Sequence, residues 1–163
     1  MVNVLFVCLG NICRSPAAEG IFRAMVAEAG LTDRISADSA GTHDYQVGRP
    51  PDRRAQTAAR RRGIDLSALR ARQVDSGDFL TSDLILAMDR NNLRDLEAMC
   101  PLSQRHRLGL FLDHAPSAGR RDVPDPYYGG DDGFEDMLDL VTLGARGLVA
   151  ELRRELPLAG RAS

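Results

Sequence analysis

Hydrophobic residues follow two alternating spacings along the chain. Residues 4–7 (VLFV) and 83–88 (DLILAM) are short apolar runs bounded by loop residues, which predicts buried strands. Residues 34–40 and 106–112 (HRLGLFL) are further strand candidates. Elsewhere apolar residues recur three or four positions apart, which predicts amphipathic helices that begin near residues 15, 51, 91 and 134.

This alternation predicts the fold class. Strands that alternate with helices form α/β domains, so we expect a three-layer domain with a short, mainly parallel central sheet flanked by helices. A loop rich in Pro, Gly and Asp at residues 122–133 precedes a C-terminal helix at residues 134–156. No repeat or linker divides the 163 residues, so we expect a single domain, residues 1–163.

Helix-terminating residues mark where the first two helices begin and end. Ser15 is predicted to cap the first helix, with Pro16 in its first turn and Gly30 after its end. The second helix is expected to open at the Pro-Pro-Asp sequence of residues 50–52 and to end before Gly63. Its arginine-rich stretch, RRAQTAARRR, is interpreted as a solvated helix face rather than an anion site.

Composition and charge exclude several classes of protein. A formal net charge of -2 argues against non-specific binding to nucleic acid or to an anionic membrane. No apolar run approaches the ~18 residues of a membrane span, and the N-terminus lacks a signal-peptide pattern. Three cysteines do not make a disulfide framework, so we expect a cytoplasmic protein. The three histidines show no metal-ligand spacing with them, so we expect neither a metal nor another cofactor.

The loop that follows the first strand is suited to hold an anion. Cys8 ends that strand, at the sheet edge where α/β domains bind ligands. Gly10 and Asn11 tolerate positive φ, so the next backbone N–H groups can turn inward beside a helix N-terminus. A Walker loop would need a lysine, but all 21 basic residues here are arginine. A dinucleotide-binding loop would need three spaced glycines, which are also missing.

The two ends of this loop carry complementary reactive groups. A cysteine near a helix N-terminus or a cation is readily ionised, so Cys8 is predicted to be a thiolate nucleophile. Arg14 can bind two oxygens of a tetrahedral oxyanion, and Ser15 can donate its hydroxyl to the sulfur. Such a set can transfer a phosphoryl group without a metal, provided that a general acid protonates the leaving oxygen. Asp125 is the candidate acid because its loop also carries two tyrosines.

The motifs together resemble one enzyme family. VLFVCLGNICRSP and the distant DPYYGG are similar to the low molecular weight protein tyrosine phosphatases. The segments SAGT, VGRPPD, ARQV, LILAMDRNNLRDL and GFEDM agree as well, so the resemblance covers essentially residues 2–155. The Cys-x5-Arg pattern alone occurs in unrelated phosphatases. Its combination with a following Ser-Pro and a distant Asp-Pro-Tyr-Tyr is highly specific.

The resemblance implies a role for each motif residue. It implies that Cys8 is the nucleophile, that Arg14 binds the phosphate and that Asp125 is the acid and later the base. The expected phosphate-binding N–H donors are Leu9, Gly10, Asn11, Ile12, Cys13, Arg14 and Ser15. The expected walls of the substrate cleft are Tyr45, Tyr127 and Tyr128. The residues expected to hold the loop and Arg14 in place are Asn11, Ser15 and Asp89. A disulfide between Cys8 and Cys13 is expected to form on oxidation.

The same resemblance implies the reaction and the partners. We expect a monomeric enzyme that hydrolyses phosphotyrosine in proteins and aryl phosphate monoesters through a phosphocysteine, with phosphate and other tetrahedral oxyanions as inhibitors. One departure is visible at residues 68–70 (ALR), because family members have a histidine just before the ARQ segment. That departure affects a supporting contact and leaves the reacting groups unchanged.

Three other functions remain open from the sequence. Arsenate reductase would require a cysteine relay, and Cys100 has no motif context for it. A non-catalytic phosphotyrosine-binding module would not need nucleophile, arginine and acid together. A phosphoarginine phosphatase of the same family would carry threonine in place of the apolar Ile12. Cys100 and the histidines are therefore interpreted as structural or incidental.

Overall fold

The central sheet has four strands, all parallel. The computed structural model describes residues 1–127 and 129–156; the predicted domain's residues 157–163 and the predicted cleft residue Tyr128 lie outside them. The strands are β1 (Val2–Cys8), β2 (Ile35–Gly41), β3 (Leu84–Ala87) and β4 (Leu108–Leu110), in the order β2-β1-β3-β4. Both neighbours of β1 run parallel to it, so the predicted parallel α/β fold is confirmed.

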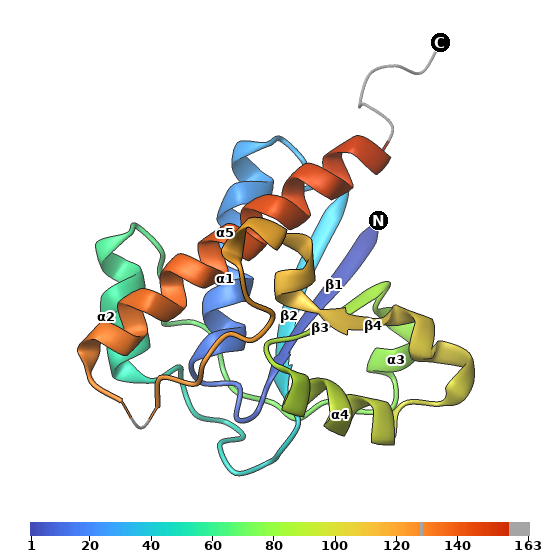
Figure 1. Cartoon of the computed structure of the whole chain (residues 1–163), viewed down its shortest axis with the longest axis horizontal. Coiled ribbons are helices and arrows are strands. Elements are labelled where there is room, and N and C mark those ends of the chain that lie inside the picture. The colour runs from blue at the N-terminus through green and yellow to red at the C-terminus, as the bar shows by residue number, and fades with distance from the viewer. Residues whose placement is uncertain (128, 157–163) are drawn as a thin grey trace.

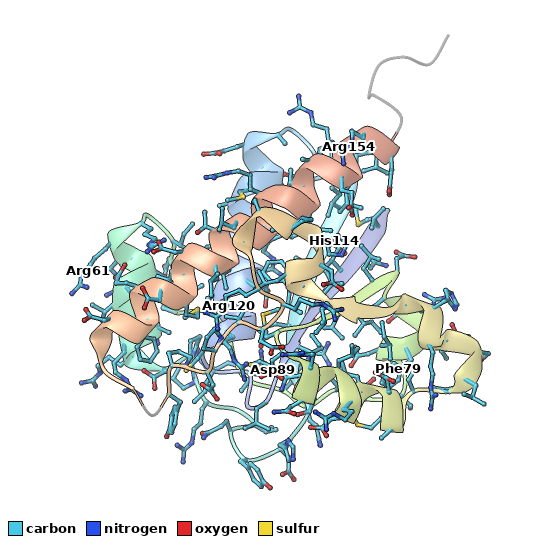
Figure 2. All side chains as sticks on the ribbon, in the orientation of Figure 1. Arg61, Phe79, Asp89, His114, Arg120 and Arg154 are labelled. Atoms are coloured by element: carbon cyan, nitrogen blue, oxygen red, sulfur yellow. The ribbon has the colours of Figure 1, made fainter. Side chains whose placement is uncertain are left out.

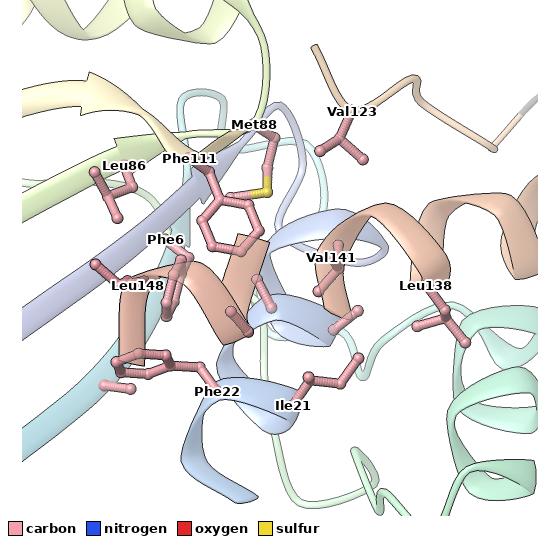
Figure 3. Packing of buried hydrophobic residues seen from close by; sticks show 14 of the residues in the cluster. Phe6, Ile21, Phe22, Leu86, Met88, Phe111, Val123, Leu138, Val141 and Leu148 are labelled. Carbon is pink, nitrogen blue, oxygen red and sulfur yellow. The ribbon is translucent and has the colours of Figure 1, made fainter. Parts of the chain in front are cut away.

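Alternate residues of β1 point to opposite faces of the sheet, as the two-residue repeat of a strand requires. Val4 and Phe6 join one hydrophobic core, whereas Leu5 and Val7 join the other. The rings of Phe22 and Phe111 meet Phe6 edge to face at centroid distances of 5.3 and 5.4 Å (Figure 3). The sheet is therefore buried on both faces, which explains why its central strands read as continuous apolar runs.

Helices cover both faces of the sheet and make the outer two layers (Figure 1). The face that carries Phe6 is covered by α1 (Arg14–Glu28) and by α5 (Asp131–Glu155), which also packs against α2 (Arg53–Arg61). The short helix α3 (Asp78–Thr81) and α4 (Arg90–Met99) supply Phe79 and Leu96 to the opposite core. Three 3₁₀ segments complete the described chain: η1 (Leu102–Arg107), η2 (Phe111–His114) and η3 (Pro116–Ala118).

The C-terminal helix approaches the segment after β4 so closely that it needs glycine. A Cβ atom placed on Gly147 would lie 1.9 Å from the carbonyl oxygen of His114. A Cβ atom on Gly144 would lie 2.5 Å from the ring of Phe111. These two glycines let α5 pack directly against the 3₁₀ turn η2. This packing fixes the position of α5 and therefore of the loop that precedes it.

Several predicted element boundaries need correction. The helix begins at Arg14 with Cys13 at the N-cap, so the prediction that Ser15 caps it is wrong. The side chain of Ser15 is turned inward, where the sulfur and an asparagine amide bind it. The strand predicted at residues 106–112 is only three residues long, because 3₁₀ turns occupy both of its flanks. The helix predicted from residue 134 begins three residues earlier, at Asp131.

The arginine-rich helix face is only partly solvated. Arg53, Arg60 and Arg61 are exposed, as predicted for such a face. Arg54 is different, because its guanidinium contacts backbone carbonyls of the loop that carries Asp125. Arg54 is therefore half-buried, and the interpretation as a solvated face describes it only in part.

Candidate active site

The loop between β1 and α1 is folded around the sulfur of Cys8. Cys8 is 3% exposed, and the backbone N–H of Asn11 donates to its sulfur at 3.3 Å. Asn11 has a φ of 59°, the left-handed conformation that asparagine tolerates better than most residues. Gly41 at the end of β2 supports the loop, since a Cβ there would lie 2.8 Å from the carbonyl oxygen of Leu9.

A chain of buried hydrogen bonds fixes this loop from behind. The Nδ2 atom of Asn11 donates to the hydroxyls of Ser15 and Ser39, at 2.8 and 2.9 Å. The hydroxyl of Ser39 donates to Glu19 at 2.7 Å, and the hydroxyl of Ser15 lies 3.0 Å from the sulfur of Cys8. Because Ser15 accepts from Asn11, its own proton can point at the sulfur, which at 3.0 Å is nearer than its other acceptor, the carbonyl of Ala40 at 3.4 Å. The network thus orients a donor toward the reactive atom.

Three members of this network were not predicted from the sequence: Ser39, Glu19 and the backbone N–H of Arg72. Glu19 is a carboxylate only 2% exposed; burial raises its pKa, while the hydrogen bond from Ser39 partly offsets that effect. The backbone N–H of Arg72 donates to Oδ1 of Asn11 at 3.0 Å. Residues 68–70, where family members carry histidine, contribute Leu69 to the edge of the core instead. The only sequence feature that could have pointed to Glu19 is that it is a polar residue at an otherwise apolar helix position.

Arg14 is buried and lies between two carboxylates. Its Nη1 donates to Oδ2 of Asp89 at 2.5 Å and to the carbonyl of Val123 at 2.9 Å. Its Nη2 lies 3.6 Å from Oδ2 of Asp125. Burial alone would lower the pKa of Arg14, but the nearby Cys8 and the bond to Asp89 raise it above its ordinary value. The side chain therefore carries a permanent charge in a fixed orientation.

Asp89 lies between β3 and the start of α4 (Figure 2) and accepts a hydrogen bond from Arg14. Its other oxygen accepts from the N–H of Asn92 at 2.7 Å and so caps α4. Since both oxygens are engaged, the carboxylate cannot rotate away from the arginine. The structure thus places Asp89 where the sequence analysis expected it, against the guanidinium.

Asp125 and Arg14, whose charged groups lie 3.6 Å apart, both line a cavity of about 160 Å³. The cavity is lined by residues of the nucleophile loop, the Asp125 loop and the segment after β2: Cys8, Leu9, Gly10, Ile12, Cys13, Arg14, Tyr45, Gln46, Asp125 and Tyr127. Tyr45 and Tyr127 line this cavity, and Gln46 is a further lining residue that the sequence gave no reason to select. Asn11 and Ser15 lie behind the wall, not in it.

The other two cysteines differ in their surroundings. Cys13 lines the cavity, and burial, followed by the charge of Asp52, raises the pKa of its thiol. Cys100 ends α4 in the core on the opposite side of the sheet, where its S–H donates to the carbonyl of Pro101. The structure therefore brings Cys13, but not Cys100, to the cavity that contains Cys8.

The described part of the chain shows neither of two further features. Residues 1–127 and 129–156 contain no group of three or more His, Cys, Asp or Glu side chains placed to hold a metal ion. Within those residues no helix has both the length and the hydropathy to cross a membrane.

A parallel α/β sheet, a Cys-x5-Arg loop after its first strand and an aspartate loop facing it define a cysteine-dependent phosphatase. The family model described as low molecular weight phosphotyrosine protein phosphatase matches residues 3–158. The chain therefore belongs to that family, and the resemblance drawn from the motifs is confirmed.

Relatives and solved structures agree over nearly the whole length. The low molecular weight protein-tyrosine-phosphatase YfkJ of Bacillus subtilis is 42% identical over 97% of this chain and 100% of its own. The Streptomyces coelicolor enzyme is 43% identical over 99% of this chain and 98% of its own. The crystal structure of a protein tyrosine phosphatase from Entamoeba histolytica, with Hepes in the active site, superimposes with a TM-score of 0.92 at 36% identity. It covers 95% of this chain and 99% of that one.

Proposed function

We propose that this chain is a protein tyrosine phosphatase that hydrolyses phosphotyrosine and aryl phosphate monoesters through a phosphocysteine on Cys8. The observation that carries the proposal is the meeting of Cys8, Arg14 and Asp125 at one cavity, although Asp125 is far from the other two in sequence. The three groups supply a nucleophile, a phosphate ligand and an acid, which is the minimum for metal-free phosphoryl transfer.

In the first step the sulfur of Cys8 attacks phosphorus and the P–O bond to the phenol breaks. Arg14 and the inward N–H groups of residues 9–15 hold the three phosphoryl oxygens, whose charge must be balanced in the transition state. Asp125 donates its proton to the departing phenolate oxygen. The products of this step are tyrosine and the phosphocysteine.

In the second step water attacks the phosphocysteine from the side that the phenol has left. Asp125, now a carboxylate, accepts a proton from that water, and the P–S bond breaks to release phosphate. The hydroxyl of Ser15, 3.0 Å from the sulfur, stabilises the thiolate as it leaves. The same contact serves both steps because it stabilises negative charge on sulfur before attack and after departure.

The cavity favours an aryl phosphate over an alkyl phosphate. Cys8 is 3% exposed, so its sulfur lies at the bottom of the cavity, and a short serine phosphate would stop before reaching it. The side chains of Ile12, Tyr45 and Tyr127 form an apolar and aromatic wall for a phenyl ring. The Entamoeba structure holds Hepes in its active site. Hepes carries a tetrahedral sulfonate, and phosphate is also a tetrahedral oxyanion, so we expect phosphate itself to inhibit this enzyme.

The structure disfavours the alternative activities. An arsenate reductase needs a relay of cysteines, and Cys100 lies in the core on the opposite side of the sheet from the Cys13 thiol. A phosphoarginine phosphatase would use a hydroxyl at position 12, where this chain has an apolar side chain lining the cavity. Tyrosine-phosphorylated proteins are therefore the proposed partners of a monomeric, cytoplasmic enzyme.

A panel of phosphopeptides tests the assignment. One peptide sequence carrying phosphotyrosine, phosphoserine or phosphoarginine is incubated with the wild-type protein and with Cys8→Ser, and released phosphate is measured. We expect the phosphotyrosine peptide to be cleaved at least ~100-fold faster than the others, and the serine variant to be inactive and to form no acid-stable phosphoenzyme. Faster cleavage of phosphoarginine, or turnover by Cys8→Ser, would contradict the proposal.

A further inference from the structure

Arg54 connects two parts of the site that the reaction needs in a fixed relation. It lies in the first turn of α2, beside the capping residue Asp52. The Nε and Nη2 atoms of Arg54 donate to the two carboxylate oxygens of Asp52, both at 3.1 Å. Burial would raise the pKa of Asp52, but the hydrogen bonds from Arg54 lower it below its usual range. Asp52 is therefore a charged partner that fixes the orientation of the guanidinium.

The outer edge of the same guanidinium reaches the loop that carries Asp125. Its Nη2 donates to the carbonyl of Tyr127 at 2.9 Å, and its Nη1 donates to the carbonyl of Gly129 at 3.3 Å. The guanidinium carbon also lies 4.7 Å from the ring centroid of Phe134, at the start of α5. The two hydrogen bonds thus hold this loop at Tyr127 and at Gly129, and the third contact holds the start of α5.

The residue that Arg54 holds is also the residue that binds the acid. The N–H of Tyr127 donates to Oδ1 of Asp125 at 3.1 Å, while the carbonyl of Tyr127 accepts from Arg54. On the other side, the N–H of Asp52 donates to the carbonyl of Ile12, in the nucleophile loop, at 2.7 Å. A continuous chain of contacts therefore runs from the nucleophile loop, through Asp52 and Arg54, to the carboxylate of Asp125.

We propose that Arg54 is a positioning residue for the general acid: it holds the Tyr127 peptide so that Asp125 faces the leaving oxygen. Arg54 does not line the cavity, so it acts through Tyr127 and not on the substrate. Only a forked side chain can reach a carboxylate and two carbonyls at once, and a lysine in its place offers a single point charge. The inference rests on the proposed function, because it assigns Asp125 the role of acid.

Four proteins test the inference: the wild type, Arg54→Met, Asp125→Asn and the double variant. Single-turnover formation of the phosphocysteine is measured with phenyl phosphate and with p-nitrophenyl phosphate. Nitrophenolate leaves with little need of a proton, so a misplaced acid slows phenyl phosphate far more. We expect Arg54→Met to slow phenyl phosphate by roughly 10-fold or more and p-nitrophenyl phosphate by less than about threefold, since a small displacement of a catalytic group is costly.

The double variant separates positioning from an effect on stability or on the cradle. With Asp125→Asn already present, the further change at Arg54 should alter the phenyl phosphate rate by less than about twofold. The inhibition constant of Arg54→Met for inorganic phosphate should stay within about twofold of the wild-type value, because that constant depends on the nucleophile loop and not on the acid. Independent, multiplicative losses from the two substitutions would overturn the inference.

Two control variants complete the experiment. Arg53→Met changes the exposed neighbour on the same helix and should leave both rates within about twofold of wild type. Asp52→Asn keeps a residue that caps helices well but removes the ion pair with Arg54. It should therefore also slow phenyl phosphate more than p-nitrophenyl phosphate, by less than Arg54→Met does. This variant keeps the inference testable if Arg54→Met folds poorly. Equal losses for both esters in Asp52→Asn would contradict the inference. A wild-type protein that cleaves neither ester would overturn the proposed function itself.

Discussion

The carboxylate of Asp89 and the guanidinium of Arg14 form a buried pair, with Oδ2 of the first 2.5 Å from Nη1 of the second. Asp89 follows β3, and Arg14 is the first residue of α1. The pair therefore ties the start of the helix behind the nucleophile to the neighbouring strand. Since the second oxygen of Asp89 caps α4, the position of the phosphate-binding arginine depends on three separate elements.

Asp89→Asn should lower activity while the fold is kept. Asparagine caps helices about as well as aspartate, so α4 stays capped. The charged hydrogen bond to Arg14 is lost, which costs about 1.5–3 kcal/mol for such bonds, or roughly 10- to 100-fold in rate. Steady-state kcat/KM on a phosphotyrosine peptide, with thermal unfolding as the control for folding, measures this effect. Wild-type activity would show that Arg14 needs no support from Asp89.

Arg14→Lys should remove most of the activity. A lysine has one compact charge where the arginine offers a planar fork that matches two phosphoryl oxygens. Loss of one preorganised donor typically costs about 10²- to 10³-fold in kcat. The measurement is kcat in a protein whose circular dichroism spectrum matches that of wild type. Near-normal turnover by the lysine variant would mean that another residue binds the phosphate.

Asp125→Asn should change both leaving-group dependence and pH dependence. The amide keeps the size of the side chain but has no proton to donate, so phosphotyrosine cleavage slows much more than p-nitrophenyl phosphate cleavage. A step that needs a general acid slows at high pH, so the wild-type rate of the first step should fall there and the rate of the variant should not. Single-turnover kinetics over a range of pH measure both effects. Equal losses for both esters would leave Asp125 with a binding role only.

Cys13→Ser should make oxidation harder to reverse. Burial and the charge of Asp52 raise the pKa of the Cys13 thiol, so peroxide attacks Cys8 first and forms a sulfenic acid. Cys13 then condenses with that acid to give a disulfide and water, which protects Cys8 from further oxidation. Each protein is treated with peroxide and then with dithiothreitol, and the recovered activity is expressed as a fraction of that protein's starting activity. This fraction should be lower for Cys13→Ser than for the wild type. Equal recovery would remove Cys13 from this role.

Gly147→Ala should destabilise the fold. The added Cβ would lie 1.9 Å from the His114 carbonyl oxygen, so backbone must shift, at a cost of roughly 1–3 kcal/mol for overpacking. Urea denaturation measures the loss in the free energy of unfolding. Gly133→Ala, in the first turn of the same helix, is the matched control, because its Cβ meets Pro126 at an ordinary 3.6 Å. The control should be neutral or up to about 1 kcal/mol more stable.

The parts of this fold that could be predicted from sequence are those where a local pattern suffices. The apolar run before Cys8 marks a central strand because both faces of the sheet are buried. The loop from Cys8 to Arg14 was predictable because glycine, asparagine and a helix start leave few other conformations. By contrast β4 is three residues long, and its length depends on the 3₁₀ turns around it, which carry no distinct sequence pattern.

The missed site residues owe their places to contacts across the fold. Glu19 is held in place by its hydrogen bond from Ser39, on β2, and Arg54 is held by its hydrogen bonds to carbonyls near the start of α5. In sequence, the only signal for Glu19 is that it is polar at an otherwise apolar helix position, and Arg54 is one arginine among several. For Ser15 the sequence predicted both a helix cap and a hydrogen bond to the sulfur; its hydroxyl lies 3.0 Å from the sulfur, whereas the N-cap position is held by Cys13. Local propensity cannot anticipate such partners.

The order in which the chain is synthesised matters for this site. Cys8 and Arg14 are synthesised long before Asp125 and before the helix α5 that packs on α1. β1 is an interior strand whose neighbour β3 also comes much later. A nascent chain therefore carries the proposed nucleophile long before the proposed acid, and phosphatase activity should appear only after the Asp125 loop and α5 have been synthesised.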